Sequence, residues 1–162
     1  MGVGAVMGRT RQVGRGAKGS TALPLGRVLG HVERHTTRLI EGEIAHQGLT
    51  VDQWRVLDIL ADGEGHPMSE LAGTIVVPGP TLTKIVDKLV DAALVYRLVD
   101  DRDRRRVLAF LSKKGQQVHA DLAPVVANIE QDIVSRLGSD GSVLVELLGE
   151  LARQYAGDSA GY

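Results

Sequence analysis

The sequence predicts a mostly helical protein with one small antiparallel sheet, an α+β unit set between long terminal helices. Across most of the 162 residues, apolar side chains recur at steps of three and four, which is the period of a helix with one buried face. Between residues 94 and 111 the period changes. There, two short runs of β-branched and aliphatic residues flank a charged stretch, a pattern typical of a β-hairpin.

Residues 1–22 predict a basic tail without fixed structure. The segment carries four basic residues and no acid, is rich in glycine and shows no apolar periodicity. It therefore cannot bury enough surface to offset the entropy of ordering. Its cations could touch DNA phosphates, or it could be a simple disordered extension. We expect one domain over residues 23–155, with a flexible tail at 156–162.

Local signals mark the helices. Residues 23–48 begin the domain with one long amphipathic helix. Thr50 and Gln53 have the spacing of a capping box, which predicts that a second helix starts there. Ser69 is placed to cap a short third helix. Pro80 fits the first turn of a fourth helix, where no amide donor is needed, and this helix is expected to end at Ala92.

The third and fourth helices, followed directly by the hairpin, predict a winged helix-turn-helix over residues 50–115. The fourth helix should bury Leu82, Ile85, Val86 and Leu89 and expose Thr81, Thr83, Lys84, Asp87 and Lys88.

A long helix from Ser112, kinked or broken at Pro124, and a last helix capped by Ser139 complete the chain. The terminal helices, 23–48 and 116–155, show more apolar surface than this small core can cover. We therefore expect them to form a dimerisation domain with a second copy.

The formal net charge of −1 hides a local excess of positive charge. Residues 79–114 carry nine basic and five acidic side chains, and this segment coincides with the fourth helix and the hairpin. Five arginines and three aspartates lie in or beside the hairpin bend, counting Arg97. Such a patch is expected where a protein meets a polyphosphate, although a solvated loop is the alternative for any single charge run.

These elements predict contacts with double-stranded DNA. The fourth helix would enter the major groove by its N-terminal residues, and the arginine-rich tip would reach the minor groove. Asp103, two residues before Arg105, could hold the planar guanidinium in one orientation. The candidate DNA-binding residues are Ser69, Pro80, Thr81, Thr83, Lys84, Lys88, Arg97, Asp103, Arg104 and Arg105.

The stretch from Trp54 to Gly115 resembles the MarR family of transcriptional regulators. The motifs that carry the resemblance are Ser69-Glu-Leu-Ala72, Gly79-Pro-Thr-Leu-Thr-Lys-Ile-Val-Asp-Lys-Leu89, Leu94-Val95 with Arg97, Asp103-Arg-Arg105, and Leu111-Ser with Gly115. With the terminal helices, the resemblance covers about Leu23 to Gln154. It implies a homodimer on a pseudo-palindromic operator, usually a repressor released by a small anionic or phenolic ligand. It also implies that Arg105 enters the minor groove with Asp103 as its orienting partner.

The sequence departs from the family pattern at three positions. Ala93 stands where the family commonly has glycine, which would be strained if the backbone there is left-handed. Ser112 replaces the usual threonine but keeps a capping hydroxyl, and Pro80 is a less usual start for the recognition helix.

A ligand pocket is expected between the terminal helices and the winged helix. Arg34, Arg38 and Trp54 are its candidate lining residues. Salt bridging by the two arginines and core packing by the tryptophan are the alternatives.

Other classes of function have little support. The chain has no cysteine, no glycine-rich phosphate loop and no nucleophile elbow, so neither an enzyme nor a cofactor is expected. His31 and His35, four residues apart, are weak candidates for a metal-responsive site that would need a further ligand. A winged helix used only for protein contacts is a further alternative. No apolar run is long enough for a membrane span or a signal core, so a cytoplasmic protein is expected.

Overall fold

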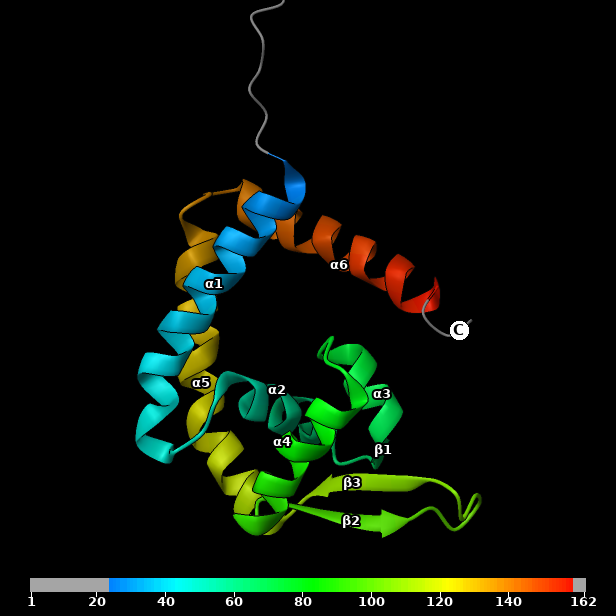
Figure 1. The fold of residues 1–162 in the computed structure, drawn as a ribbon. Coiled ribbons are helices and arrows are strands. Elements are labelled where there is room, and N and C mark those ends of the chain that lie inside the picture. Colours follow the sequence, from blue (N-terminus) through cyan, green and yellow to red (C-terminus); the bar gives the residue numbers. More distant parts are fainter. Residues whose placement is uncertain (1–23, 159–162) are drawn as a thin grey trace, which may run out of the picture.

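The computed structural model describes residues 24–158, with no account of side chains beyond residue 155. The tail expected at residues 1–22 lies outside this range, while the last helix continues past residue 155 to Asp158. The elements, in order (Figure 1), are α1 (Leu25–Ile44), η1 (Ala45–Gln47), α2 (Val51–Ile59), η2 (Leu60–Asp62), β1 (His66–Pro67), α3 (Met68–Thr74), α4 (Gly79–Asp91), β2 (Val95–Val99), β3 (Val107–Leu111), α5 (Lys113–Ser135) and α6 (Asp140–Asp158).

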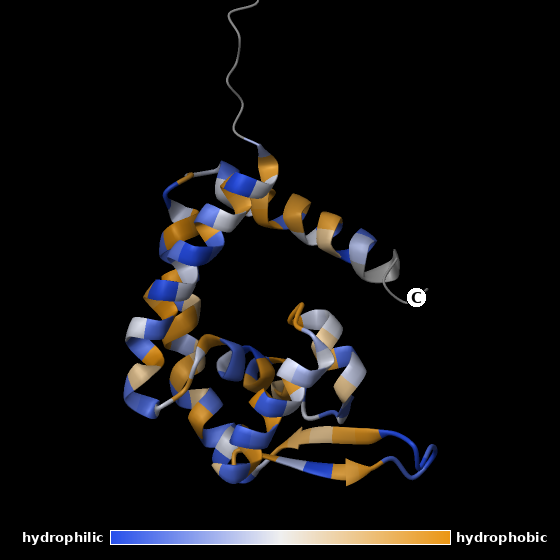
Figure 2. Ribbon diagram, in the orientation of Figure 1, coloured by the Kyte–Doolittle hydropathy of each residue, from blue (hydrophilic) through white to orange (hydrophobic). Residues whose placement is uncertain are grey.

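The terminal helices form one side of the molecule, and the winged helix-turn-helix forms the other. Helices α1 and α5 run side by side, and α6 leaves the far end of α5 and extends away from the rest (Figure 1). Apolar residues continue along α6 and the outer part of α1 (Figure 2). Many of them are exposed, including Leu25, Val32, Val143 and Leu147. No helix among residues 24–158 is both long and apolar enough to cross a bilayer.

The core consists of aliphatic side chains and Trp54, and it joins both sides of the molecule. Ile44 of α1, Leu57 of α2, Val86 of α4 and Leu122 of α5 all belong to the same buried cluster. Because the terminal helices and the winged helix-turn-helix share one close-packed core, a displacement of either part changes the packing of the other.

Helix α2 starts as predicted. Thr50 Oγ1 accepts from the Gln53 amide at 3.3 Å, and Gln53 Oε1 accepts from the Thr50 amide at 2.9 Å, so the capping box is confirmed. The indole of Trp54 is buried against α5, where it stacks on the His119 ring with centroids 5.1 Å apart. His119 Nε2 lies 3.0 Å from Asp58 Oδ1, which ties α2 to α5 a second time.

Helix α3 starts two residues earlier than predicted, and Ser69 does not cap it. The helix begins at Met68 after Pro67, and no side chain caps its first turn. The reason is β1, which the sequence analysis missed because two residues are too short for a periodic signal. His66 and Pro67 pair with Ala109 and Leu108 of β3, giving a sheet of order β1-β3-β2. The strand runs directly into the helix, so the N-cap position falls on Pro67, which has no side-chain acceptor.

The end of α4 and the start of α5 are joined by tight contacts. Ala93 has a left-handed backbone with φ of 57°, and the Leu94 amide donates to Leu89 O at 2.9 Å. Ser112 Oγ donates to Ala93 O at 2.7 Å and also caps α5. Gly115 packs so closely on the Leu94 carbonyl that any Cβ would collide with it. The base of the hairpin is therefore fixed to both helices.

The two predictions for the C-terminal helices were only partly right. Helix α5 passes through Pro124 as one continuous helix, so it is not broken there. Pro124 and Ala120 are both exposed, so water can hydrate the Ala120 carbonyl that loses its amide partner. The Ser139 hydroxyl bonds to Asp140 Oδ1 at 3.5 Å, a side-chain contact in place of the expected helix cap.

His66 bridges two acidic side chains at the junction of β1 and α3. Its Nε2 lies 2.8 Å from Asp62 Oδ2, and its Nδ1 lies 2.9 Å from Glu70 Oε1. Burial lowers the pKa of His66, but the hydrogen bonds to Glu70 and Asp62 raise it by more, so the net pKa is raised. The pKa of Asp62 is lowered, first by the Glu64 amide and then by His66.

We expect Ala93→Gly to stabilise the protein by roughly 0.5 to 1 kcal/mol, because glycine adopts a positive φ without steric strain. The gain is reduced by the greater freedom of glycine in the unfolded chain. Urea denaturation would measure it. Ala120→Gly in α5 is the matched control and should destabilise by about 1 kcal/mol. Equal losses in the two variants would contradict the strain at Ala93.

The His66 bridge should make stability depend on pH. Because the pKa of folded His66 is raised, its contribution is complete below the ordinary value of 6.5 and disappears as the pH rises through the folded pKa. The Asp62 contribution disappears as the pH falls below 3.8. Comparing wild type with His66→Gln, we expect the largest stability difference between these values, below about 1 kcal/mol because both carboxylates are half exposed. His31→Gln, on the exposed face of α1, is the control and should change the free energy of unfolding by less than about 0.5 kcal/mol.

Candidate nucleic-acid interface

Helix α4 presents an outer face of polar and basic residues. Leu82, Val86 and Leu89 are buried and fix the rotation of the helix. On the opposite side, Thr81, Thr83, Lys84 and Lys88 are exposed as predicted, as are Pro80 in the first turn and Ser69 on α3. The Thr83 hydroxyl donates to Gly79 O at 3.1 Å, so part of its hydrogen-bonding capacity is already used. Within residues 24–158, neither Lys84 nor Lys88 forms an ion pair, so both ammonium groups are available.

The aspartates of the hairpin tip shape its backbone. Asp100 Oδ1 accepts from the Arg102 amide at 2.9 Å, and Asp103 Oδ1 accepts from the Arg105 amide at 3.0 Å. Two backbone bonds close the turn: the Asp100 amide donates to Arg106 O, and the Arg106 amide donates to Asp103 O within the loop. Asp and Asn commonly stabilise tight turns by accepting from the amide two residues on.

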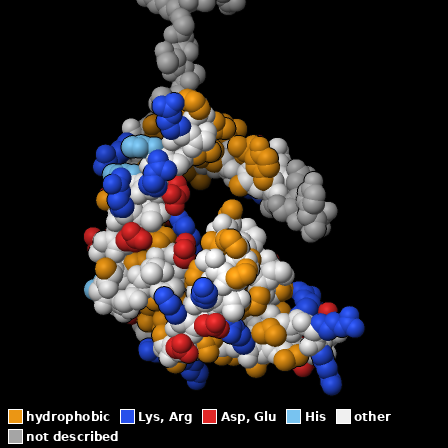
Figure 3. Space-filling model, in the orientation of Figure 1, with side chains coloured by type: hydrophobic (Ala, Val, Ile, Leu, Met, Phe, Trp, Pro, Cys, Tyr) orange, Lys and Arg blue, Asp and Glu red, His pale blue; other side chains and the backbone are white. Residues whose placement is uncertain are grey.

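Asp103 therefore acts differently from the prediction. Its carboxylate was expected to hold the guanidinium of Arg105, but in the structure it binds the backbone amide of that residue. The aspartate therefore fixes the backbone of Arg105, while the guanidinium has no ion pair within residues 24–158. Arg102, which the sequence analysis did not single out, lies on the same tip and, like Arg104 and Arg105, has no ion pair among the described residues. Lys and Arg side chains gather at the end of the hairpin in Figure 3.

Arg97 does not extend outward with the other cations. Its Nη1 lies 2.7 Å from Asp87 Oδ1, so the side chain links β2 to α4. Nε and Nη2 of Arg97 are buried and have no hydrogen-bond partner in the described structure. The side chain is thus enclosed between the hairpin and the recognition helix. Its role in the structure is to set the angle between them.

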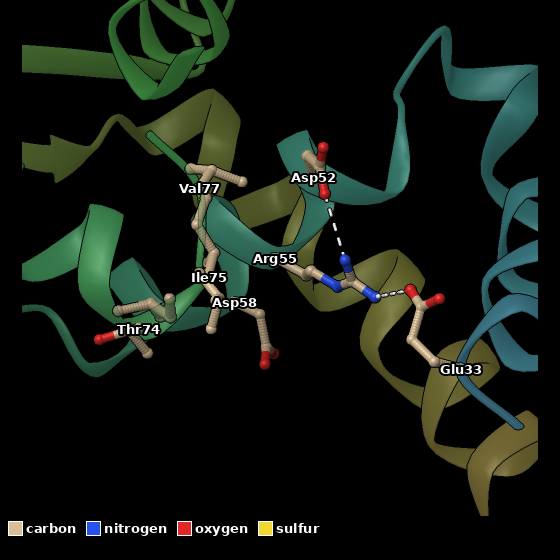
Figure 4. A pocket seen from close by; sticks show the side chains of 9 residues that line it. Glu33, Asp52, Arg55, Asp58, Thr74, Ile75 and Val77 are labelled. Carbon is tan, nitrogen blue, oxygen red and sulfur yellow. Dashed lines mark hydrogen bonds and ion pairs between the residues drawn. The ribbon is translucent and has the colours of Figure 1, made fainter. Parts of the chain in front are cut away.

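A cleft separates the terminal helices from the turn between α3 and α4 (Figure 4). It has a volume of about 540 Å³ and lies where the pocket was expected. The Arg55 guanidinium bridges Asp52 at 3.2 Å and Glu33 at 3.3 Å, as the dashed lines in Figure 4 show. The Thr37 hydroxyl and Arg55 lower the pKa of Glu33, so it remains ionised. The remaining lining residues are Asp58, Ile59, Thr74, Ile75, Val76 and Val77.

The three residues suggested for the ligand pocket do not line this cleft. Arg34 and Arg38 are exposed on α1, and Arg38 Nε donates to Arg34 O at 3.2 Å. Trp54 is only 4% exposed because His119 covers it. The family resemblance and the usual position of pockets at module junctions predicted a pocket here, but they could not tell which face of α1 meets α2. Arg55, which is at the centre of the cleft, was not singled out.

The suggested metal site gains no further ligand in the structure. His31 and His35 are both exposed on α1. Across residues 24–158, histidines and acidic residues nowhere gather in a group of three or more suited to a metal ion.

The Arg97–Asp87 pair gives a prediction about the hairpin. Asp87→Ala should destabilise the protein by about 1 to 2 kcal/mol, because it leaves a largely buried guanidinium without its carboxylate. Asp91→Ala removes a carboxylate from the last turn of the same helix, where Asp91 is exposed, and should change the free energy of unfolding by less than about 0.5 kcal/mol. Urea denaturation of both variants tests this. A loss for Asp91→Ala as large as that for Asp87→Ala would contradict it.

Comparisons with known proteins agree with this geometry. The sequence model described as the MarR family matches residues 47–106. The HTH-type transcriptional regulator FarR of Neisseria gonorrhoeae is 32% identical over 106 residues, which are 65% of this chain and 73% of that protein.

Two solved structures are similar over most of the chain. NadR in complex with 4-hydroxyphenylacetate has a TM-score of 0.73 at 27% identity, covering 82% of this chain and 95% of that one. A mutant MarR from E. coli, complexed with operator DNA, has a TM-score of 0.69 at 26% identity, covering 79% of this chain and 92% of that one.

The expected winged helix-turn-helix fold is confirmed by these structures, and the relatives are regulators, not enzymes. By its identity to FarR, its match to the family model and its fold, the chain belongs to the MarR family of transcriptional regulators.

Proposed function

We propose that the protein is a sequence-specific regulator that binds double-stranded DNA as a homodimer. The observation that carries this proposal is the set of unpaired cations on two adjacent elements, the outer face of α4 and the hairpin tip. Clustered lysine and arginine side chains without acidic partners are suited to neutralising phosphates. The operator complex of the E. coli relative, which has the same fold, supports the proposal.

The two elements fit different parts of a duplex. Helix α4 is the size of element that the major groove admits, and its first turn would place Thr81 and Lys84 near base edges. The tip arginines, led by Arg105, would enter the minor groove, where narrow segments concentrate negative potential. Arg97 would act indirectly through its bond to Asp87, which sets the distance between the two insertions.

The exposed apolar surface of the terminal helices supports the homodimer. Leu25 on α1 and Leu147 on α6 are each more than half exposed, and α6 projects away from α1 and α5 (Figure 1). A monomer would leave this surface in water, whereas a second copy could bury it. A twofold pair would carry two recognition helices, which fits a pseudo-palindromic operator and repression by occupancy of that site.

The cleft beside Arg55 is our proposed site for a small effector. It touches α1, α2 and the turn that leads into α4, so a ligand there would contact both halves of the molecule. Of the two ligand classes that the family resemblance implies, the phenolic one fits better. Glu33, Asp52 and Asp58 outnumber the single cation Arg55, which disfavours a free carboxylate and supplies acceptors for a hydroxyl group. The complex of NadR with 4-hydroxyphenylacetate supports an aromatic effector with a phenolic hydroxyl. That ligand also carries a carboxylate, which the acidic lining of this cleft disfavours.

DNA binding can be tested with a duplex selected by the protein from a random-sequence pool. We expect two chains per duplex and a steep loss of affinity with salt. Arg105→Ala should weaken specific binding by about 1 to 3 kcal/mol, whereas Lys88→Ala should weaken binding to all sequences and reduce the salt slope by about 1.

Arg136→Ala, at the end of α5, removes the same charge far from the hairpin and is the matched control. Wild-type binding by both Arg105→Ala and Lys88→Ala would refute the interface. A protein that selects no duplex at low salt would instead favour a winged helix used for protein contacts.

A further inference from the structure

A small hollow lies between the first turn of α2 and the outer face of α4. Its volume is about 210 Å³, and it is separate from the larger cleft beside Arg55. The residues that line it are Thr50, Gln53, Thr81, Lys84, Ile85 and Lys88. No acidic residue is among them. The hollow therefore combines the start of one helix with the basic face of another.

Gln53 gives the hollow a hydrogen-bond donor on a largely buried side chain. The residue is only 7% exposed. Its Oε1 accepts from the Thr50 amide at 2.9 Å, which identifies that end of the side-chain amide as the oxygen. Its other end, Nε2, makes no hydrogen bond within the described residues, and Gln53 borders the hollow. A side-chain amide nitrogen can donate two hydrogen bonds, so this donor is available for a ligand that enters the hollow.

The other groups around the hollow favour an anion. Lys84 and Lys88, one turn apart on α4, are free of ion pairs in the part of the chain described here. The Thr50 hydroxyl accepts from the Gln53 amide and can donate its own proton outward. The start of α2 adds the partial positive charge of a helix N-terminus. Asp52, the acid of this first turn, is held away by Arg55.

We propose that this hollow binds one backbone phosphate of the DNA, with Gln53 Nε2 and the two lysines as its donors. The proposal rests on the proposed function, since the phosphate comes from the duplex that α4 enters. Thr81, Lys84 and Lys88 belong both to the hollow and to the exposed face of α4. A helix in the major groove is flanked by the sugar-phosphate backbone, and contacts to phosphates set the register of the protein on the duplex. Through this phosphate contact, the capping box of α2 would fix the position of α4 on the duplex.

Gln53→Glu tests the donor without removing the cap. The Glu side chain keeps an oxygen for the Thr50 amide, as in the usual capping box, but it replaces Nε2 with a negatively charged oxygen. We expect thermal unfolding to be unchanged and the affinity for the selected duplex to fall at least about 10-fold. Gln131→Glu, exposed on α5, makes the same chemical change away from α4 and should bind like wild type.

Replacing single phosphates with neutral methylphosphonates separates a local contact from a general charge effect. In wild type, neutralising one phosphate per half-site should weaken binding about 10-fold or more. In Gln53→Glu, the same replacement should have little effect or improve binding, because the phosphate no longer meets a donor. The other phosphates should respond alike in both proteins.

The outcomes distinguish this proposal from the proposed function. If the wild type binds the duplex but Gln53→Glu binds equally well, the phosphate site is wrong and the regulator remains. The same conclusion follows if Gln53→Glu is weaker but shows the wild-type pattern of methylphosphonate effects. If the wild type binds no duplex at all, both proposals are overturned.

Discussion

Burial of one stripe of α4 is the constraint on which the rest of the structure depends. Leu82, Val86 and Leu89 are inserted into a core shared with α1, α2 and α5, so the helix cannot rotate without exposing them. Its opposite face is therefore fixed as well, and the lysines on it have a defined direction. Each of these fully buried aliphatic side chains contributes roughly 1.5 to 3 kcal/mol, more than any of the surface ion pairs. The recognition surface is thus set mainly by apolar packing and only adjusted by charge.

Ion pairs and charged side chains then position the hairpin relative to α4. Arg97 and Asp87 join β2 to α4, and the aspartates of the tip hold the backbone of the bend. The acids of this basic segment therefore arrange the chain while leaving most of the tip arginines unpaired. Two of the three carboxylates beside the five arginines, Asp100 and Asp103, thus order the loop without neutralising the cations that the proposed DNA contact needs.

Much of the fold could be predicted from the sequence because strong local signals agree with it. The capping box at Thr50, the change of period near Leu94 and the stripe on α4 all correspond to observed elements. The failures share a different cause. Strand β1 exists only because β3 lies beside it, and α3 then begins at Met68 instead of being capped by Ser69. Such contacts between distant segments leave no periodic trace in the sequence.

In the candidate site, too, features set by local sequence were predicted, whereas contacts between distant segments were not. The exposed side chains of α4 followed from helical geometry, but the partners of individual charges did not. Arg97 turns toward Asp87, and Asp103 binds an amide instead of a guanidinium. The cleft was expected in the correct place, yet its central residue is Arg55, because the face that α1 presents to α2 is decided by packing. The family resemblance could identify motifs, but not the partners of these side chains or the residues that line the cleft.

The short strand β1 also limits how the hairpin can bend. It pairs with β3 only at Leu108 and Ala109, in the outer half of the ladder, so the part of the hairpin beyond this three-stranded section is a two-stranded ribbon. Isolated two-stranded ribbons are much less rigid than sheets of three strands. Bending is therefore confined to the outer ribbon, roughly residues 99–107. The hairpin can follow grooves of different width with its end while its base keeps a constant angle to the recognition helix.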